Sequence, residues 1–159
     1  MKQIYLPILS ILLSLISTPL LANILDDLQI DSSYKIEVYA SGLDSPRQMT
    51  ESDDGWIFIG SRSGGSVFAI RDTDGNGVSD EKVLVADGLT MPTGVSIFNG
   101  DLFFSEIDRI WKIENIDIFL MKSSAELPEK ILVTDNLPSD KWHGWKWIMH
   151  DENGSLYTN

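Results

Sequence analysis

One sequence pattern recurs at intervals of 47 and 48 residues, and this repeat limits what the chain can fold into. Each copy begins with a lysine, continues as an apolar run and ends in a turn. A turn closed by glycine and a second apolar run come next, and in the first two copies a third apolar run follows. The shared units occupy Lys35–Pro46, Lys82–Pro92 and Lys130–Pro138, then Asp53–Ile59, Asn99–Phe104 and Glu152–Tyr157, and finally Ser66–Arg71 and Asp108–Ile113.

The apolar runs have the composition of β-strands. They are four to six residues long, rich in β-branched and aromatic residues, and bounded by Gly, Asp, Asn and Pro. No window keeps a helical period for long, although we expect a short helical turn within Ile116–Ser124. Short strands that recur at such a period, about four per repeat, are typical of an all-β β-propeller. A β-sandwich is the alternative, but it gives no reason for the same turn to recur.

The length of the chain matches only part of a propeller. Propellers have about four to eight blades, which requires roughly 180 residues or more. This chain of 159 residues holds two full repeats and the opening of a third. We therefore expect residues 23–159 to be the truncated N-terminal part of a β-propeller domain, about two and a half blades, and we expect this part alone to be inactive.

Residues 1–22 have the organisation of a secretory signal peptide. Lys2 is followed by the apolar run Ile8–Ile16, which is too short to span a bilayer as a helix. A Leu20-x-Ala22 cleavage signal closes the segment. Because no further charged residue follows until Asp26, an uncleaved N-terminal anchor is the alternative. We expect an exported protein, periplasmic or secreted, with no membrane span after signal cleavage.

Composition excludes several classes of protein. The 24 acidic residues against 12 basic ones, a formal charge of −12, argue against a nucleic-acid partner, since phosphate binding requires Lys and Arg. The absence of cysteine excludes a disulfide scaffold, a thiolate metal site and a cysteine nucleophile. A hydrophobic share of 43% is too high for a disordered chain. The composition therefore indicates an acidic globular protein.

The most unusual segment is Lys141–Trp147, which reads KWHGWKW. It occupies the place in the third repeat that Arg47–Met49 holds in the first and Thr93–Val95 in the second. In a propeller this place leads into the innermost strand, at the mouth of the central channel. His143 there is a candidate general base, and the tryptophans offer stacking faces for a planar cofactor or a sugar ring. The alternative is a structural histidine with tryptophans packed between blades.

The second candidate site is an acidic loop. Asp72, Asp74, Asn76 and Asp80 place oxygen ligands in a D-x-D-x-N-G-x-x-D pattern, as at the start of a calcium loop. A complete EF-hand loop has Glu at its twelfth position, where this chain has Val83. Asp, Asn and Gly are also the residues of a tight hairpin. A calcium site and a plain hairpin both stay open.

Taken in order, these motifs resemble the N-terminal part of the glucose/sorbosone dehydrogenase family, exported six-bladed propeller quinoproteins that use pyrroloquinoline quinone. The resemblance covers nearly all of residues 23–159 and depends on the order and spacing of several motifs together. They are Tyr34–Leu43, Gly60–Gly65, Val67–Arg71, Asp72–Gly77, Leu84–Leu89, Met91-Pro92, Glu106–Ile110, Leu137–Asp140 and His143–Trp145.

The resemblance implies an oxidoreductase that oxidises a sugar or aldose-like substrate. It implies that His143 takes the hydroxyl proton while hydride passes to pyrroloquinoline quinone, and it makes Arg62 a candidate cofactor-binding residue. Calcium is a further candidate cofactor. The implied partners are a small sugar or alcohol and an electron acceptor such as a cytochrome c. A non-catalytic binding or scaffold propeller and a calcium-dependent lactonase-like propeller are the alternatives.

Overall fold

The computed structural model describes residue 25, residues 27–122, residue 124 and residues 126–159. The predicted signal peptide therefore lies outside the described residues. The chain divides into two compact units, residues 1–37 and residues 38–159. In the described part of the first unit, no strand forms and Lys35 Nζ lies 2.6 Å from Glu37 Oε1. All of the strands found among these described residues belong to the second unit.

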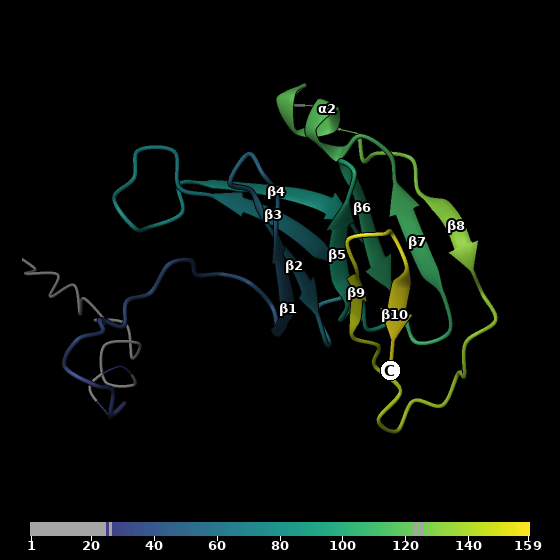
Figure 1. Cartoon of the computed structure of the whole chain (residues 1–159), viewed down its shortest axis with the longest axis horizontal. Helices are drawn as coiled ribbons and strands as arrows, with labels where there is room; N and C mark the ends of the chain where they lie inside the picture. Colours follow the sequence, from purple (N-terminus) through teal and green to yellow (C-terminus); the bar gives the residue numbers. More distant parts are fainter. Residues whose placement is uncertain (1–24, 26, 123, 125) are drawn as a thin grey trace, which may run out of the picture. The chain divides into compact units, whose positions relative to one another are not determined.

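The second unit consists of antiparallel sheets whose strands are neighbours in chain order (Figure 1). Helix α2 (Ile116–Met121) connects the third and fourth strands of the second sheet and confirms the predicted helical turn. The first sheet contains β1 (Pro46–Glu51), β2 (Ile57–Ser61), β3 (Val67–Arg71) and β4 (Glu81–Ala86); the second contains β5 (Val95–Phe98), β6 (Asp101–Ser105), β7 (Ile110–Ile113) and β8 (Ile131–Thr134); the third contains β9 (Ile148–His150) and β10 (Leu156–Thr158).

The first strands of the three sheets lie next to one another. Strand β5 is in contact with β1 on one side and with β9 on the other. Successive four-stranded sheets whose first strands are neighbours are the blades of a propeller. The predicted all-β, partial β-propeller is therefore confirmed, with two complete blades and the first two strands of a third among the described residues.

The core lies between the first two blades. Phe58 on β2 and Phe104 on β6 are fully buried, and burial of a phenylalanine side chain contributes about 2–3 kcal/mol. Along β6, the buried Leu102 and Phe104 alternate with the less buried Asp101 and Phe103, as expected of a strand that packs one face against a neighbouring blade. The other buried members are Trp56, Val67, Ala69, Val85, Ala86, Leu89, Val95, Leu102, Ile113, Ile116 and Leu120.

A glycine with a positive φ angle lies in the connection between the first two strands of each described blade, although two residues join β5 to β6 and five residues join each of the other two pairs. Gly55, Gly100 and Gly154 adopt φ angles of +79°, +79° and +84°. This left-handed region is open to glycine at little cost, whereas a side chain would add strain. The glycine-closed turns in the sequence repeat are therefore confirmed as β-hairpin turns.

The expected strand at Lys35–Gly42 does not form. Its counterparts in the repeat are β4 and β8, which pair with β3 and β7. A strand requires a neighbour for its main-chain groups. Among the described residues, Tyr39 offers one main-chain bond to a neighbour, from Ser79 N–H to its carbonyl oxygen at 2.8 Å. The sequence repeat therefore showed that this segment has the composition of a strand, but it did not show which other strand could pair with it.

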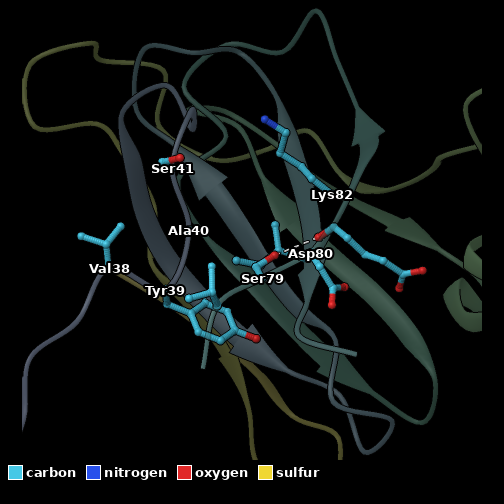
Figure 2. Close-up of a pocket in the computed structure, with 10 residues that line it drawn as sticks. Val38, Tyr39, Ala40, Ser41, Ser79, Asp80 and Lys82 are labelled. Atoms are coloured by element: carbon cyan, nitrogen blue, oxygen red, sulfur yellow. Dashed lines mark hydrogen bonds between the residues drawn. The ribbon is translucent and has the colours of Figure 1, made fainter. Parts of the chain in front are cut away.

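Residues 38–41 instead run beside the start of β4 (Figure 2). The hydroxyl of Tyr39 accepts the N–H of Asp72 at 3.1 Å, and Lys82 Nζ donates to the carbonyl of Gly42 at 3.2 Å. With Ser79 and Asp80, this segment borders a cavity of about 190 Å³. Side-chain contacts therefore hold it beside the first blade without a strand ladder.

His150 comes directly before the Asp151–Gly154 turn, a place that predicts a solvated side chain, but it is partly buried. It ends β9, with its ring centroid 5.1 Å from that of Phe98 and 4.4 Å from that of Phe103. Its Nδ1 lies 2.9 Å from Ser96 Oγ, which also accepts the His150 N–H at 3.2 Å. Burial lowers the pKa of the His150 imidazole, and the nearby charge of Asp151 opposes this effect only partly.

We expect this burial to make folding sensitive to pH. Because the folded-state pKa of His150 is lowered, the unfolded chain binds the proton more readily, so the free energy of unfolding falls as pH drops below about 6.5. Urea denaturation at about pH 7.5 and about pH 5.5 measures the loss. His150→Phe should reduce this difference, whereas His143→Asn should retain it. An equal pH dependence in His150→Phe and wild type would contradict the assignment.

Candidate functional site

A cleft of about 360 Å³ lies where the three blades begin. Its walls come from β1 and from the segments that lead into β5 and β9, which are the equivalent places in the three repeats, and from Asn159 after β10. The fold thus brings together side chains that are about 50 to 100 positions apart in the chain. The lining residues are Arg47, Gln48, Met49, Thr93, Trp145, Lys146, Trp147 and Asn159.

His143 lies beside this cleft, in the connection between β8 and β9, and its side chain is exposed. Its ring centroid lies 6.0 Å from that of Trp142 and 5.2 Å from that of Trp145, which lines the cleft. An imidazole that is exposed to solvent and flanked by aromatic rings can receive a proton from a bound ligand.

Arg62, the other residue predicted from the sequence, follows β2 directly. Its guanidinium carbon lies 4.9 Å from the ring centroid of Trp145, within the range of a cation–π contact. Because His143 also contacts Trp145, the structure brings the two predicted residues to the same indole. These residues come from the first and third blades.

Arg47 is a site residue that the sequence analysis did not select. It stands on β1, and its guanidinium carbon lies 5.9 Å from the same Trp145 ring. Within the described part of the chain, neither Arg47 nor Arg62 forms an ion pair. Two guanidinium groups without an ion-pair partner thus lie beside one indole, an arrangement whose chemistry suits a planar ligand with carboxylate groups. The sequence did hold one signal for Arg47: its position in the repeat is equivalent to that of the segment that contains His143 and Trp147.

Gln48 was also missed, and it joins the three blades. Its Nε2 donates to the carbonyl oxygens of Val95 at 2.9 Å and of Ile148 at 2.7 Å. Its Oε1 accepts the N–H of Ile148 at 3.3 Å. One amide on β1 thus binds main-chain groups of β5 and β9, which fixes the strands that form the cleft. No sequence signal identifies such a bond, because its partners are main-chain groups.

Close packing around residue 144 explains why a glycine follows His143. A Cβ atom at this position would overlap the carbonyl oxygen of Asp140 and lie 3.3 Å from Ile107 Cγ2. The connection therefore folds back on itself so closely that a larger residue cannot be accommodated. His143 itself has a φ of +56°, which is uncommon for a residue with a side chain.

The acidic loop between β3 and β4 forms a second site. Carboxylate oxygens of Asp72, Asp74 and Asp80 lie within 4.8 Å of one another, a separation that a single calcium ion could bridge. Thr73 Oγ1 donates to both oxygens of Asp80, at 2.9 and 2.8 Å. Asn76 Oδ1 accepts the N–H of Val78 at 2.8 Å. The loop is thus both a hairpin connection and a convergent oxygen cluster.

The carboxylate of Asp72 is held by the main chain of this loop. Its two oxygens accept the N–H groups of Gly75 at 2.8 Å and Gly77 at 2.7 Å. The bond from Gly77 is the largest cause of the lowered pKa of Asp72, and burial, the next largest, opposes it. Asp72 is therefore charged and oriented at neutral pH, as a ligand for a hard cation must be.

Comparison with known proteins shows the fold without naming a family. No family model matches the chain. An uncharacterized protein of Borreliella burgdorferi is 27% identical over 144 residues, which are 86% of this chain and 36% of that protein. The PQQ domain of pyranose dehydrogenase from Coprinopsis cinerea, in its holo form, superimposes with a TM-score of 0.60 at 14% identity, over 73% of this chain and 27% of that one.

A carbohydrate-active enzyme of family AA12 from Trichoderma reesei has the same fold. Its iodide structure superimposes with a TM-score of 0.57 at 13% identity, over 74% of this chain and 29% of that one. Its calcium structure gives a TM-score of 0.55 at 14% identity, over 72% and 28%. The chain thus spans about a third of its relative in Borreliella burgdorferi and less than a third of the solved structures. Among the described residues, no helix has the length and apolarity needed to cross a bilayer.

Proposed function

We propose that this chain belongs to an exported quinoprotein oxidoreductase that oxidises a sugar or aldose-like substrate with pyrroloquinoline quinone as cofactor. The observation that carries the proposal is the meeting of Arg47, Arg62 and His143 at the ring of Trp145. The fold shared with the PQQ domain of a pyranose dehydrogenase and with a carbohydrate-active enzyme of family AA12 supports it. The proposal refers to the whole protein, of which these blades form the described part.

The residues of the cleft fit the proposed cofactor. Pyrroloquinoline quinone is a flat, aromatic quinone that carries carboxylate groups, and it accepts a hydride when bound. The unpaired guanidiniums of Arg47 and Arg62 can pair with carboxylates, and the indole of Trp145 offers a stacking face.

His143 is assigned the role of general base. A hydroxyl group of the substrate must lose its proton as the attached carbon loses hydride, so that a carbonyl forms. The neutral imidazole of His143 receives this proton on a ring nitrogen, which must come within hydrogen-bond reach of the hydroxyl oxygen. The exposed ring allows such an approach. The electrons then leave to an acceptor such as a cytochrome c.

Turnover by the full-length protein tests this proposal. The protein is incubated with pyrroloquinoline quinone, calcium and a panel of aldoses, and reduction of a redox dye is followed. Sugar-dependent dye reduction that requires the quinone is the expected result. Quinone binding without turnover of any sugar would reject the substrate class, and absence of both would favour a scaffold propeller. Hydrolysis of sugar lactones without quinone would favour the lactonase-like alternative.

We propose in addition that the acidic loop binds calcium through Asp72, Asp74 and Asp80. The convergence of their carboxylate oxygens supports this site. Saturating calcium should raise the midpoint of thermal unfolding by about 5 °C, because a ligand that binds only the folded state stabilises it. Asp80→Asn should abolish the shift, whereas Asp54→Asn, a change in an exposed turn outside the loop, should retain it. An undiminished shift in Asp80→Asn would contradict the site.

A further inference from the structure

Lys146 is a buried lysine that forms no ion pair with any described residue. Its relative exposure is 6%, although three of its neighbours in the chain, Lys141, Trp142 and Trp147, are exposed. Removing an ammonium group from water is costly unless hydrogen bonds replace its hydration. The partners that satisfy this ammonium are therefore informative about its role.

The partners are main-chain carbonyls of the connection that carries His143. Lys146 Nζ donates to the carbonyl oxygen of Gly144 at 2.8 Å, and it lies 3.5 Å from the carbonyl oxygen of Pro138. The ammonium thus closes residues 138–146 into a loop from inside. Gly144, the residue bonded most closely, follows His143 directly.

The main chain of Lys146 is anchored to the second blade. Its carbonyl oxygen accepts Thr93 Oγ1 at 2.8 Å and Ser105 Oγ at 3.1 Å. Both hydroxyls are buried, with relative exposures of 2% for Thr93 and 0% for Ser105. A Cβ atom on Gly94 would lie 2.5 Å from the same carbonyl oxygen, so the fit leaves no free space. The main chain of Lys146 is therefore fixed to the second blade, and its side chain extends from there to the loop.

The backbone at His143 needs such support. Its φ of +56° is unfavourable for a residue with a Cβ atom and persists only where the surrounding structure holds it. The fold-back of Asp140 over Gly144 holds one side of this turn, and the ammonium of Lys146 holds the carbonyl that follows it. The exposed ring of His143 thus stands on a strained residue, and the next residue along the chain is bonded to a buried charge.

We propose that Lys146 is a positioning residue for His143. It connects the second blade, through Thr93 and Ser105, to the carbonyl oxygen of Gly144, the residue after His143, and so sets where the imidazole stands relative to Trp145 and Arg62. The positioning follows from the contacts alone. Its consequence for catalysis rests on the proposed function, in which His143 is the base. The ammonium itself does not contact substrate or cofactor in this role.

Lys146→Met tests the proposal, because methionine keeps much of the length and removes the charge. Lys141→Met, at an exposed lysine of the same connection, is the matched control. In the full-length protein, the C2-proton resonance of His143, assigned by its loss in His143→Asn, reports the loop. The resonance of His150, assigned by its loss in His150→Phe, reports the blade interface where it packs between Phe98 and Phe103.

The expected result is a selective change. In Lys146→Met the His143 resonance should move or broaden while that of His150 stays, and Lys141→Met should leave both in place. Turnover should fall about 100-fold in Lys146→Met with little change in quinone affinity, since a misplaced base costs rate rather than binding. An unchanged His143 resonance overturns the proposal, and equal shifts of both resonances would make Lys146 a general structural residue and overturn it too.

A second measurement covers the case in which Lys146→Met does not fold. Proton exchange at the lysine ammonium groups of the wild-type protein is followed by nitrogen-detected NMR. The ammonium of Lys146 should exchange far more slowly than that of Lys141, and equal rates would overturn the proposal. Neither NMR readout requires activity. If wild type neither binds quinone nor oxidises sugar, the proposed function fails while the positioning of His143 is still decided by the spectra.

Discussion

Replacing His143 by asparagine is expected to lower kcat for quinone-dependent sugar oxidation about 1,000-fold, with KM for the sugar changed only a few-fold. Asparagine has a similar size but cannot accept the hydroxyl proton at neutral pH. The exposed position of His143 beside Trp145 means that the substitution removes little packing. Stopped-flow or steady-state dye reduction by the full-length protein measures the effect.

The matched control is the other histidine of these blades. His150→Gln should reduce stability, because this ring packs between Phe98 and Phe103, but it should leave kcat nearly unchanged at a temperature where the variant is folded. Turnover by His143→Asn within about threefold of wild type would remove His143 from the mechanism. A loss of activity in both variants to the same degree would indicate a stability effect instead.

Replacing Gln48 by leucine is expected to lower the free energy of unfolding by about 3 kcal/mol. The change removes hydrogen bonds to Val95 and Ile148 and leaves main-chain groups of two neighbouring blades without partners. A partly buried group that loses its partner costs more than the bond itself contributed. Urea denaturation of the full-length protein, with an unchanged m-value, measures the effect.

Two further variants separate the hydrogen bonds from packing. Gln48→Glu keeps the shape of the side chain but turns a carboxylate oxygen toward two carbonyl oxygens, so it should destabilise at least as much as leucine. Met49→Leu, at the next position of β1, where the side chain is 64% exposed, should change stability by less than about 0.5 kcal/mol. Wild-type stability in Gln48→Leu would show that the blades do not depend on this amide.

Much of the fold was predictable because the repeat encodes it. Gly55, Gly100 and Gly154 occur at equivalent places and all adopt the positive φ that a tight hairpin turn requires. The short apolar runs that contain Phe58 and Phe104 are likewise a local pattern. Pairing at a distance is not local, and so the strand expected at Lys35–Gly42 could not be assigned a partner. The same limit explains His150, whose place between two phenylalanines depends on the contact of β5, β6 and β9.

The site was predictable only in its outline. The equivalence of Arg47–Met49 and Lys141–Trp147 within the repeat indicated that these segments converge, and His143 was selected from its chemistry. The contacts of Arg62 and Arg47 with one indole depend on the angle between the first and third blades, which no local pattern records. Gln48 and Lys146 bind main-chain carbonyls, and such bonds leave no pairing signal in the sequence.

Binding of pyrroloquinoline quinone to the full-length protein tests the central claim most directly. Quenching of tryptophan fluorescence should saturate with a Kd in the micromolar range or below, since Trp145 stands at the site. Arg47→Gln combined with Arg62→Gln should weaken binding about 100-fold, because charge-assisted bonds to the carboxylates are lost, whereas Arg109→Gln, at a guanidinium that pairs with Asp108, should not. Absence of saturable binding by wild type, or equal affinity in the double variant, would contradict this account.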